Sequence, residues 1–160
     1  MPDTDLDNVD EWRGPTASQA AGLTLAAARR AIAAVEREAA TMRVAMSVAV
    51  VDAGDQLVAF ARMDGADLVG VRLAQDKAYT ALVNRMPTRD LAPVVQPGTE
   101  FYGYDSLSGG RMVVFAGGMP LERDGVLVGA VGVSGGSADQ DQRAADAAVE
   151  AFSATGPQAR

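Results

Sequence analysis

The sequence contains neither cysteine nor histidine among its 160 residues. Without cysteine, disulfides and thiolate metal sites are excluded. Without histidine, the commonest general base and the commonest nitrogen ligand of transition metals and haem iron are missing. Ser–His–Asp and Cys–His mechanisms are therefore excluded as well. Acid–base chemistry would therefore depend on Asp, Glu, Lys or Tyr. A metal ion could be held only by oxygen donors, and we predict no metal site.

Positive charge is also scarce, with 14 Lys and Arg against 21 Asp and Glu, which gives a formal net charge of −7. Nucleic-acid backbones and anionic membrane surfaces attract basic faces, so we expect neither as a partner. The sequence shows no apolar run of transmembrane length and no secretory signal at its start. The expected compartment is the cytoplasm.

The length is that of one domain, with short extensions at both ends. Residues 1–14 form an acidic N-terminal arm that carries −4 of the net charge, residues 15–155 form the domain, and residues 156–160 form a frayed tail. The only tryptophan, Trp12, would anchor the arm either on its own domain or on a neighbouring subunit.

Three helices are predicted from apolar spacing and from capping residues. The first runs over 16–40, with Thr16 and Gln19 as a capping box. The second runs over 68–85, with Asp67 as its N-cap. The third runs over 138–152, with Ser137 and Gln140 as a second capping box.

Five strands are predicted between these helices. Alternating or β-branched runs occur at 44–51, 56–63, 112–115 and 126–133, and a further strand precedes the turn at Asp124-Gly125. That dipeptide is typical of a type I′ hairpin. Because the strands follow one another through short turns, the pattern indicates an α+β fold with an antiparallel sheet.

More than half of the 17 glycines lie between Gly109 and Gly136. Glycine inside a strand marks the close approach of another backbone or of a ligand. Gly129 and Gly132 therefore predict either a tightly crossing helix or neighbouring subunit, or a bound molecule. Four further glycines are candidate ligand-binding residues: Gly109, Gly110, Gly117 and Gly118.

The segment 93–108 has no periodicity but contains Phe101, Tyr102 and Tyr104. Long irregular segments are often functional. We interpret this one as a lid or pocket wall, with packing between subunits as the alternative.

A small-molecule pocket is predicted between this segment, the end of the second strand and the second helix. Its proposed catalytic residues are Lys77, Tyr102 and Asp64. Its proposed ligand-binding residues, besides the four glycines, are Arg62, Tyr104 and Arg111. In the simpler alternative, Lys77 is an exposed surface residue, and Arg62 and Asp64 form a surface ion pair.

Three blocks in this order resemble the GlcG/HbpS family and the C-terminal half of PduO-type corrinoid adenosyltransferases: VAVVDAGDQLVAFARMDGA, QDKAYTALVNRMPTRDL and GGRMVVFAGGMPLERDGVLVGAVGVSGGSADQDQRAADAAVEAF. The resemblance implies a profilin-like, three-layer α/β/α fold with a five-stranded antiparallel sheet. It also implies homo-oligomers, from dimers up to the octamers of some members, and haem binding in some members.

The sequence departs from many relatives in the last helix, where the run 139–142 reads DQDQ and lacks their histidine. The first hypothesis is a small-ligand-binding protein for haem or another tetrapyrrole, with Tyr79, Tyr102 or Tyr104 as iron ligand. The second is a cofactor-independent isomerase, hydratase or lyase acting on a small carboxylate, which an arginine would hold. The third is an oligomeric protein whose role is assembly.

Overall fold

The computed structural model describes residues 22–154. The predictions for the acidic arm, Trp12, the Thr16–Gln19 capping box and the tail lie outside these residues. The described elements, in chain order, are α2 (Leu25–Met42), β1 (Ser47–Asp52), β2 (Leu57–Arg62), α3 (Leu68–Asn84), the 3₁₀ helices η1 (Thr88–Val94) and η2 (Tyr104–Ser106), α4 (Leu107–Gly110), β3 (Gly118–Arg123), β4 (Val126–Ser134) and α5 (Ala138–Ser153).

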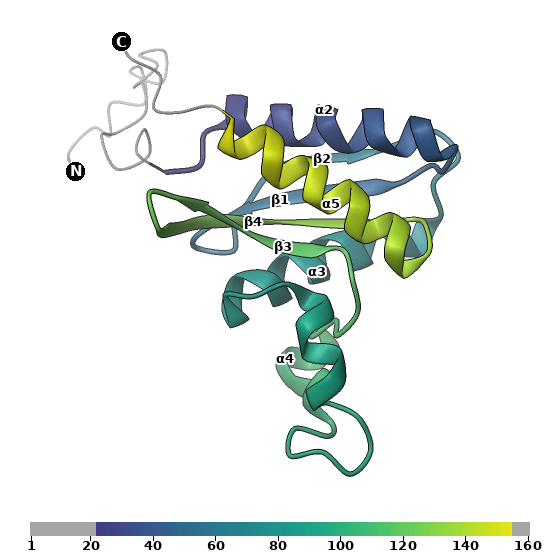
Figure 1. Ribbon diagram of the computed structural model, residues 1–160, viewed down its shortest axis with the longest axis vertical. Coiled ribbons are helices and arrows are strands. Elements are labelled where there is room, and N and C mark those ends of the chain that lie inside the picture. The colour runs from purple at the N-terminus through teal and green to yellow at the C-terminus, as the bar shows by residue number, and fades with distance from the viewer. Residues whose placement is uncertain (1–21, 155–160) are drawn as a thin grey trace, which may run out of the picture.

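The described strands form one sheet in the order β2-β1-β4-β3, and every neighbouring pair is antiparallel. In Figure 1, α2 and α5 lie together on one face of this sheet and α3 covers the other. The α+β class and the antiparallel sheet with flanking helices are therefore confirmed. The prediction of five strands is wrong, because the sheet has four.

The missing strand is the run 112–115, which extends beside α3 and η1 without joining the sheet. Val113 N donates to Thr80 Oγ1 at 2.9 Å, and Thr88 Oγ1 donates to Phe115 O at 2.7 Å. Buried backbone groups must find hydrogen-bond partners. Here two threonine side chains provide those partners, so an apolar β-branched run stays out of the ladder.

The turn between β3 and β4 has the predicted geometry. Asp124 and Gly125 have φ angles of 52° and 75°. Two positive φ values at the central positions define the type I′ turn, whose twist matches that of the flanking strands.

Helix ends follow the sequence signals only in part. The predicted capping box of Ser137 and Gln140 is present at the start of α5. Asp67 precedes α3, but its side chain makes no capping hydrogen bond. The first described helix, α2, begins at Leu25, where Thr24 Oγ1 accepts from Ala27 N at 3.1 Å.

Gly132 marks the point where α3 crosses the sheet. A Cβ atom built on Gly132 would overlap the carbonyl oxygen of Ala74 and lie 2.5 Å from Ala78 N, and both atoms belong to α3. The tightly crossing helix is therefore the correct reading of this glycine, and a ligand is not needed to explain it.

Alanine supplies much of the core between the sheet and the α2–α5 layer. Small side chains let two helix backbones approach closely, and α2 and α5 are packed against each other at an oblique angle. The fully buried members of this layer include Ala28, Ala31, Ala144, Ala145 and Ala148, with Phe152 at the end of α5.

Candidate functional site

Arg111 joins three separate elements on the α3 side of the sheet. Its Nη1 lies 2.8 Å from Asp55 Oδ2 in the β1–β2 turn, and its Nε lies 3.2 Å from Asp76 Oδ1 on α3. The guanidinium carbon lies 3.8 Å from the centre of the Tyr79 ring, a cation–π geometry. The second oxygen of Asp76 accepts from Arg72 Nε at 2.5 Å. We call Asp55, Arg72, Asp76, Tyr79 and Arg111 the Arg111 cluster.

The charges of this cluster are balanced, two arginines against two aspartates. Burial acts to lower the pKa of Arg111, but the hydrogen bonds and charges of Asp55 and Asp76 outweigh burial and raise it. Because both carboxylates already engage the guanidinium, an incoming carboxylate would have to displace them or share their donors.

Gly109 and Gly110 lie directly before Arg111 and are exposed. Both have positive φ, 68° and 79°, and so does Ser108 at 53°. Nothing lies within 4 Å of a Cβ built on either glycine, so neighbouring atoms do not explain these residues. Left-handed backbone conformations favour glycine, and here they turn the chain so that Arg111 points back to the body.

Gly117 and Gly118 differ from Gly109 and Gly110, because neighbouring atoms leave no room for a Cβ atom at either position. A Cβ on Gly117 would lie 2.9 Å from Lys77 Nζ and 3.0 Å from Asp141 Cβ. A Cβ on Gly118 would overlap Thr88 and the backbone of Lys77. These two glycines let the chain pass close to α3 and α5.

Lys77 has 0% of its side chain exposed. Its Nζ lies 2.5 Å from Asp141 Oδ2 on α5 and 2.8 Å from Val133 O on β4, and 5.0 Å from the centre of the Phe115 ring. Asp141 in turn accepts from Gly136 N at 2.8 Å. Burial lowers the pKa of Lys77, and the charge and hydrogen bond of Asp141 oppose that shift.

The other predicted site residues have separate surroundings. Arg62 donates through Nε and Nη2 to Ala66 O, at 3.1 and 2.9 Å. Asp64 is exposed, and with Arg62, Met63 and Gly65 it lines a shallow pocket of about 180 Å³. No hydrogen bond or ion pair within residues 22–154 joins Arg62 or Asp64 to Lys77 or Arg111.

Two of the predicted tyrosines lie on the segment that leaves the body after α3. Tyr104 OH donates to Asn84 Oδ1 at 2.6 Å, which ties the segment to the end of α3. The side chain of Tyr102 is exposed. The structure thus brings Arg111 and Tyr79 together but leaves Lys77 in the core and Tyr102 on the surface.

Sequence reasoning overlooked Asp55 and Asp76 as partners of Arg111. The spacing of Arg72 and Asp76, four residues apart on a helix, is a pattern that places two side chains together. It could have indicated one edge of the cluster. The contact of Asp55 with Arg111 spans 56 residues, and no local pattern predicts it.

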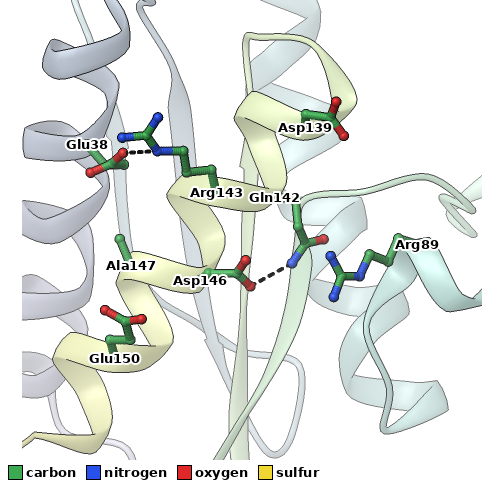
Figure 2. A pocket seen from close by; sticks show the side chains of 8 residues that line it. All are labelled: Glu38, Arg89, Asp139, Gln142, Arg143, Asp146, Ala147 and Glu150. Carbon is green, nitrogen blue, oxygen red and sulfur yellow. Dashed lines mark hydrogen bonds and ion pairs between the residues drawn. The ribbon is translucent and has the colours of Figure 1, made fainter.

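A groove between α5, α2 and η1 also escaped the sequence analysis (Figure 2). Its volume is about 450 Å³, and it is lined by Glu38, Arg89, Asp139, Gln142, Arg143, Asp146, Ala147 and Glu150. All but two of these residues lie on α5, spaced so that they share one side of the helix.

Across the part of the chain that the structure describes, His, Cys, Asp and Glu side chains form no group of three or more that could hold a metal ion. None of the described helices is both long and apolar enough to cross a membrane.

Known proteins are similar in sequence to most of this chain. Residues 23–150 match the family model described as "Haem degrading protein HbpS-like". An uncharacterised 15.0 kDa protein from the dhaT-dhaS intergenic region of Citrobacter freundii is 40% identical over 135 residues, covering 84% of this chain and 95% of the relative.

The corrinoid adenosyltransferase PduO of Salmonella typhimurium is 46% identical over 121 residues, which cover 75% of this chain but 35% of PduO. A crystal structure described as a PduOC:heme complex is 38% identical, with a TM-score of 0.79, and the match covers 81% of this chain and 94% of that one. The resemblance seen in the three sequence blocks is thereby confirmed, and the chain belongs to the HbpS-like family.

Proposed function

We propose that this protein binds haem or a related tetrapyrrole. The observation that carries the proposal is the similarity to the PduOC chain solved with heme, which extends over 94% of that chain at 38% identity. The family description, which names a haem-degrading protein, supports the same ligand class. The adenosyltransferase activity named for PduO belongs to a much longer protein and is not part of the proposal.

The segment from Thr88 to Arg111 offers a surface that fits such a ligand. We call this segment the arm; it is distinct from the acidic N-terminal arm of residues 1–14. It projects from the body of the molecule in Figure 1. It exposes several apolar or aromatic side chains: Val94, Phe101, Tyr102 and Leu107. A tetrapyrrole presents large apolar faces, and aromatic and aliphatic side chains are the usual surroundings of such faces.

Tyr102 is the side chain best suited to meet the iron. The sequence has no histidine, but tyrosine is an established axial ligand of haem iron. Tyr79 OH donates to Ser108 Oγ at 3.0 Å, and Tyr104 OH is held by Asn84. Tyr102 is 68% exposed, and its hydroxyl has no hydrogen-bond partner within residues 22–154. Bound haem would supply an iron centre, and Tyr102 would hold it on the arm.

Titration with haemin followed by absorption spectroscopy tests the proposal. The wild-type protein should give a saturable shift of the Soret band, with the spectrum of an oxygen-ligated ferric haem. Tyr102→Phe should change that spectrum and weaken binding. Tyr104→Phe is the matched control, because its hydroxyl already serves Asn84, and it should leave the spectrum unchanged. Absence of saturable binding, or equal spectra for both variants and wild type, would refute the proposal.

The alternative, a cofactor-independent enzyme for a small carboxylate, has weaker support. Arg111 would hold the substrate, but Asp55 and Asp76 already neutralise it. Lys77 would move the proton, and burial lowers its pKa in the required direction, yet its side chain has no exposed surface.

We also propose that the protein self-associates through the outer side of α3. Leu68 and Val69, in the first turn of this helix, are 76% and 63% exposed, and Val83 in its last turn and Met86 just beyond its end are exposed as well. Adjacent exposed apolar side chains of this size are typical of protein interfaces. Light scattering at micromolar concentration should show at least a dimer, and Leu68→Glu should reduce the mass, whereas Glu36→Gln on α2 should not. A monomeric wild type would contradict this proposal.

A further inference from the structure

Gln142, which lines the groove in Figure 2, carries an unused hydrogen-bond acceptor. The residue is 5% exposed, and its carbonyl oxygen Oε1 has no hydrogen-bond partner within residues 22–154. Buried polar atoms are nearly always paired, so an unpaired one needs an explanation. An unpaired acceptor on a residue that lines a groove is explained if a donor from outside reaches it when its cover moves.

The orientation of this amide is fixed by its nitrogen. Gln142 Nε2 donates to Asp146 Oδ1 at 2.8 Å and lies 3.0 Å from the sulfur of Met119. If the amide were rotated, its oxygen would face the Asp146 carboxylate, and two acceptors would oppose each other. The carbonyl oxygen therefore points away from Asp146, toward Arg89 (Figure 2).

The groove has more negative than positive charge. Arg143 and Glu38 form an ion pair and cancel each other. Asp139, Asp146 and Glu150 remain, and neither Asp139 nor Glu150 has a side-chain partner among the described residues. Arg89 is the one remaining cation in the lining, and it forms an ion pair with Asp90, whose Oδ1 lies 3.8 Å from Arg89 Nε. The uncompensated charge is thus two negative units.

We propose that this groove binds an aliphatic diamine. One ammonium group donates to Gln142 Oε1 and to the carboxylate of Asp146, and the other donates to Glu150. Asp146 and Glu150 are four residues apart on α5, which separates them by about 6 Å along the helix. That separation matches the length of a four-carbon diamine. Its two positive charges suit a groove of net negative charge, whereas a zwitterion would not reduce that charge.

Arg89 regulates access to the acceptor. Oε1 is shielded from solvent, and Arg89 lines the same groove as Gln142. Arg89 is exposed, and within residues 22–154 the single ion pair of its side chain is the 3.8 Å contact with Asp90, so it can swing away when the ammonium group arrives. Removing Arg89 should therefore strengthen diamine binding, since both the obstacle and a repelling charge disappear.

Isothermal titration of the full chain with 1,4-diaminobutane at low ionic strength tests the proposal, because screening by salt would weaken contacts at an open groove. Asp146→Asn and Gln142→Met should each weaken binding about tenfold, the loss of one charge-assisted hydrogen bond. Asp105→Asn, which removes a carboxylate from the arm, is the charge-matched control and should bind as the wild type does. Arg89→Ala should bind more tightly.

Four results would overturn the proposal. The first is the absence of saturable binding to wild type. The second is equal affinity for butylamine, which has one ammonium group. The third is equal weakening by Asp146→Asn and Asp105→Asn, which would show a response to net charge alone. The last is weaker binding by Arg89→Ala, which would indicate a ligand carrying an anionic group.

Discussion

Lys77 Nζ lies 2.5 Å from Asp141 Oδ2, and this pair connects the middle of α3 to the first turn of α5 through the interior of the protein. Residues from opposite layers meet here, past the edge strand β3, at a place where Gly117 leaves room for them. The pair is a structural link between the two helical layers.

Lys77→Met should destabilise the protein strongly, because it leaves the Asp141 carboxylate buried without its cation. Breaking a buried pair in this way typically costs about 3–5 kcal/mol. Urea denaturation measures the change in the free energy of unfolding.

The double variant Lys77→Met with Asp141→Leu is the informative control. It removes both charges and should recover part of the lost stability, although Gly136 N then loses its acceptor. If Lys77→Met lowers the free energy of unfolding by less than about 1 kcal/mol, the pair contributes no more than an exposed ion pair, and its structural role is contradicted.

Stability should also rise at alkaline pH. The pKa of Lys77 in the folded protein is lowered from 10.5, so between the folded value and 10.5 the unfolded chain binds more protons. The free energy of unfolding therefore increases with pH through that window and is constant with respect to this group below it.

Denaturation curves of wild type and Lys77→Met across the alkaline range isolate the effect, because the two proteins differ only at this residue. The wild type should show the rise and the variant should lack it. A fall in the difference with increasing pH would mean that the charge of Asp141 outweighs burial and raises the pKa.

Gly132→Ala should be severely destabilising, since the added methyl group meets the backbone of α3 rather than a movable side chain. Overpacking typically costs about 1–3 kcal/mol, and a backbone clash belongs at or above the upper end. Thermal unfolding gives the shift in Tm. Gly54→Ala is the matched control, because its Cβ would lie 3.3 Å from a single side-chain atom, Asp52 Oδ1, and its Tm should change little.

Thr88→Val should loosen the return of the arm to the body. The hydroxyl donates to Phe115 O at 2.7 Å and accepts from Gly118 N at 3.0 Å, and both bonds disappear while the side-chain volume is kept. Each buried backbone group left unpaired costs about 1–3 kcal/mol. The Gly118 amide should exchange with deuterium faster.

Thr41→Val, at the exposed end of α2, removes a hydroxyl that donates to Glu38 O at 2.7 Å, and water can take the place of this donor, so stability should be nearly unchanged. If both threonine variants behave alike, the hydroxyl of Thr88 is not a structural anchor.

The regular elements could be predicted because their signals are local. Asp124-Gly125 dictates its turn, and Ser137 with Gln140 dictates the start of α5. The prediction of a fifth strand at 112–115 was wrong for a different reason. Its sequence favours a strand, but the partners of its backbone are Thr80 and Thr88, which lie in other segments.

The site was harder to predict because its contacts are long-range. Helical spacing places Lys77 on the flank of an apolar stripe, and only the approach of Asp141, 64 residues away, explains its complete burial. The same holds for Asp55 and Arg111. The sequence predicted that Arg111 binds a ligand, whereas its partners in the structure are two carboxylates of the same chain.

Thr80 and Thr88 also separate changes in the arm from the packing of the sheet. Thr80 and Thr88 bind the chain at Arg111, Val113 and Phe115, so the arm leaves the body and returns to it at nearly the same place. Insertions or deletions between these anchors would leave the register of β3 and β4 unaltered. A change in the length or composition of the arm would therefore leave the packing of the sheet and its helices in place.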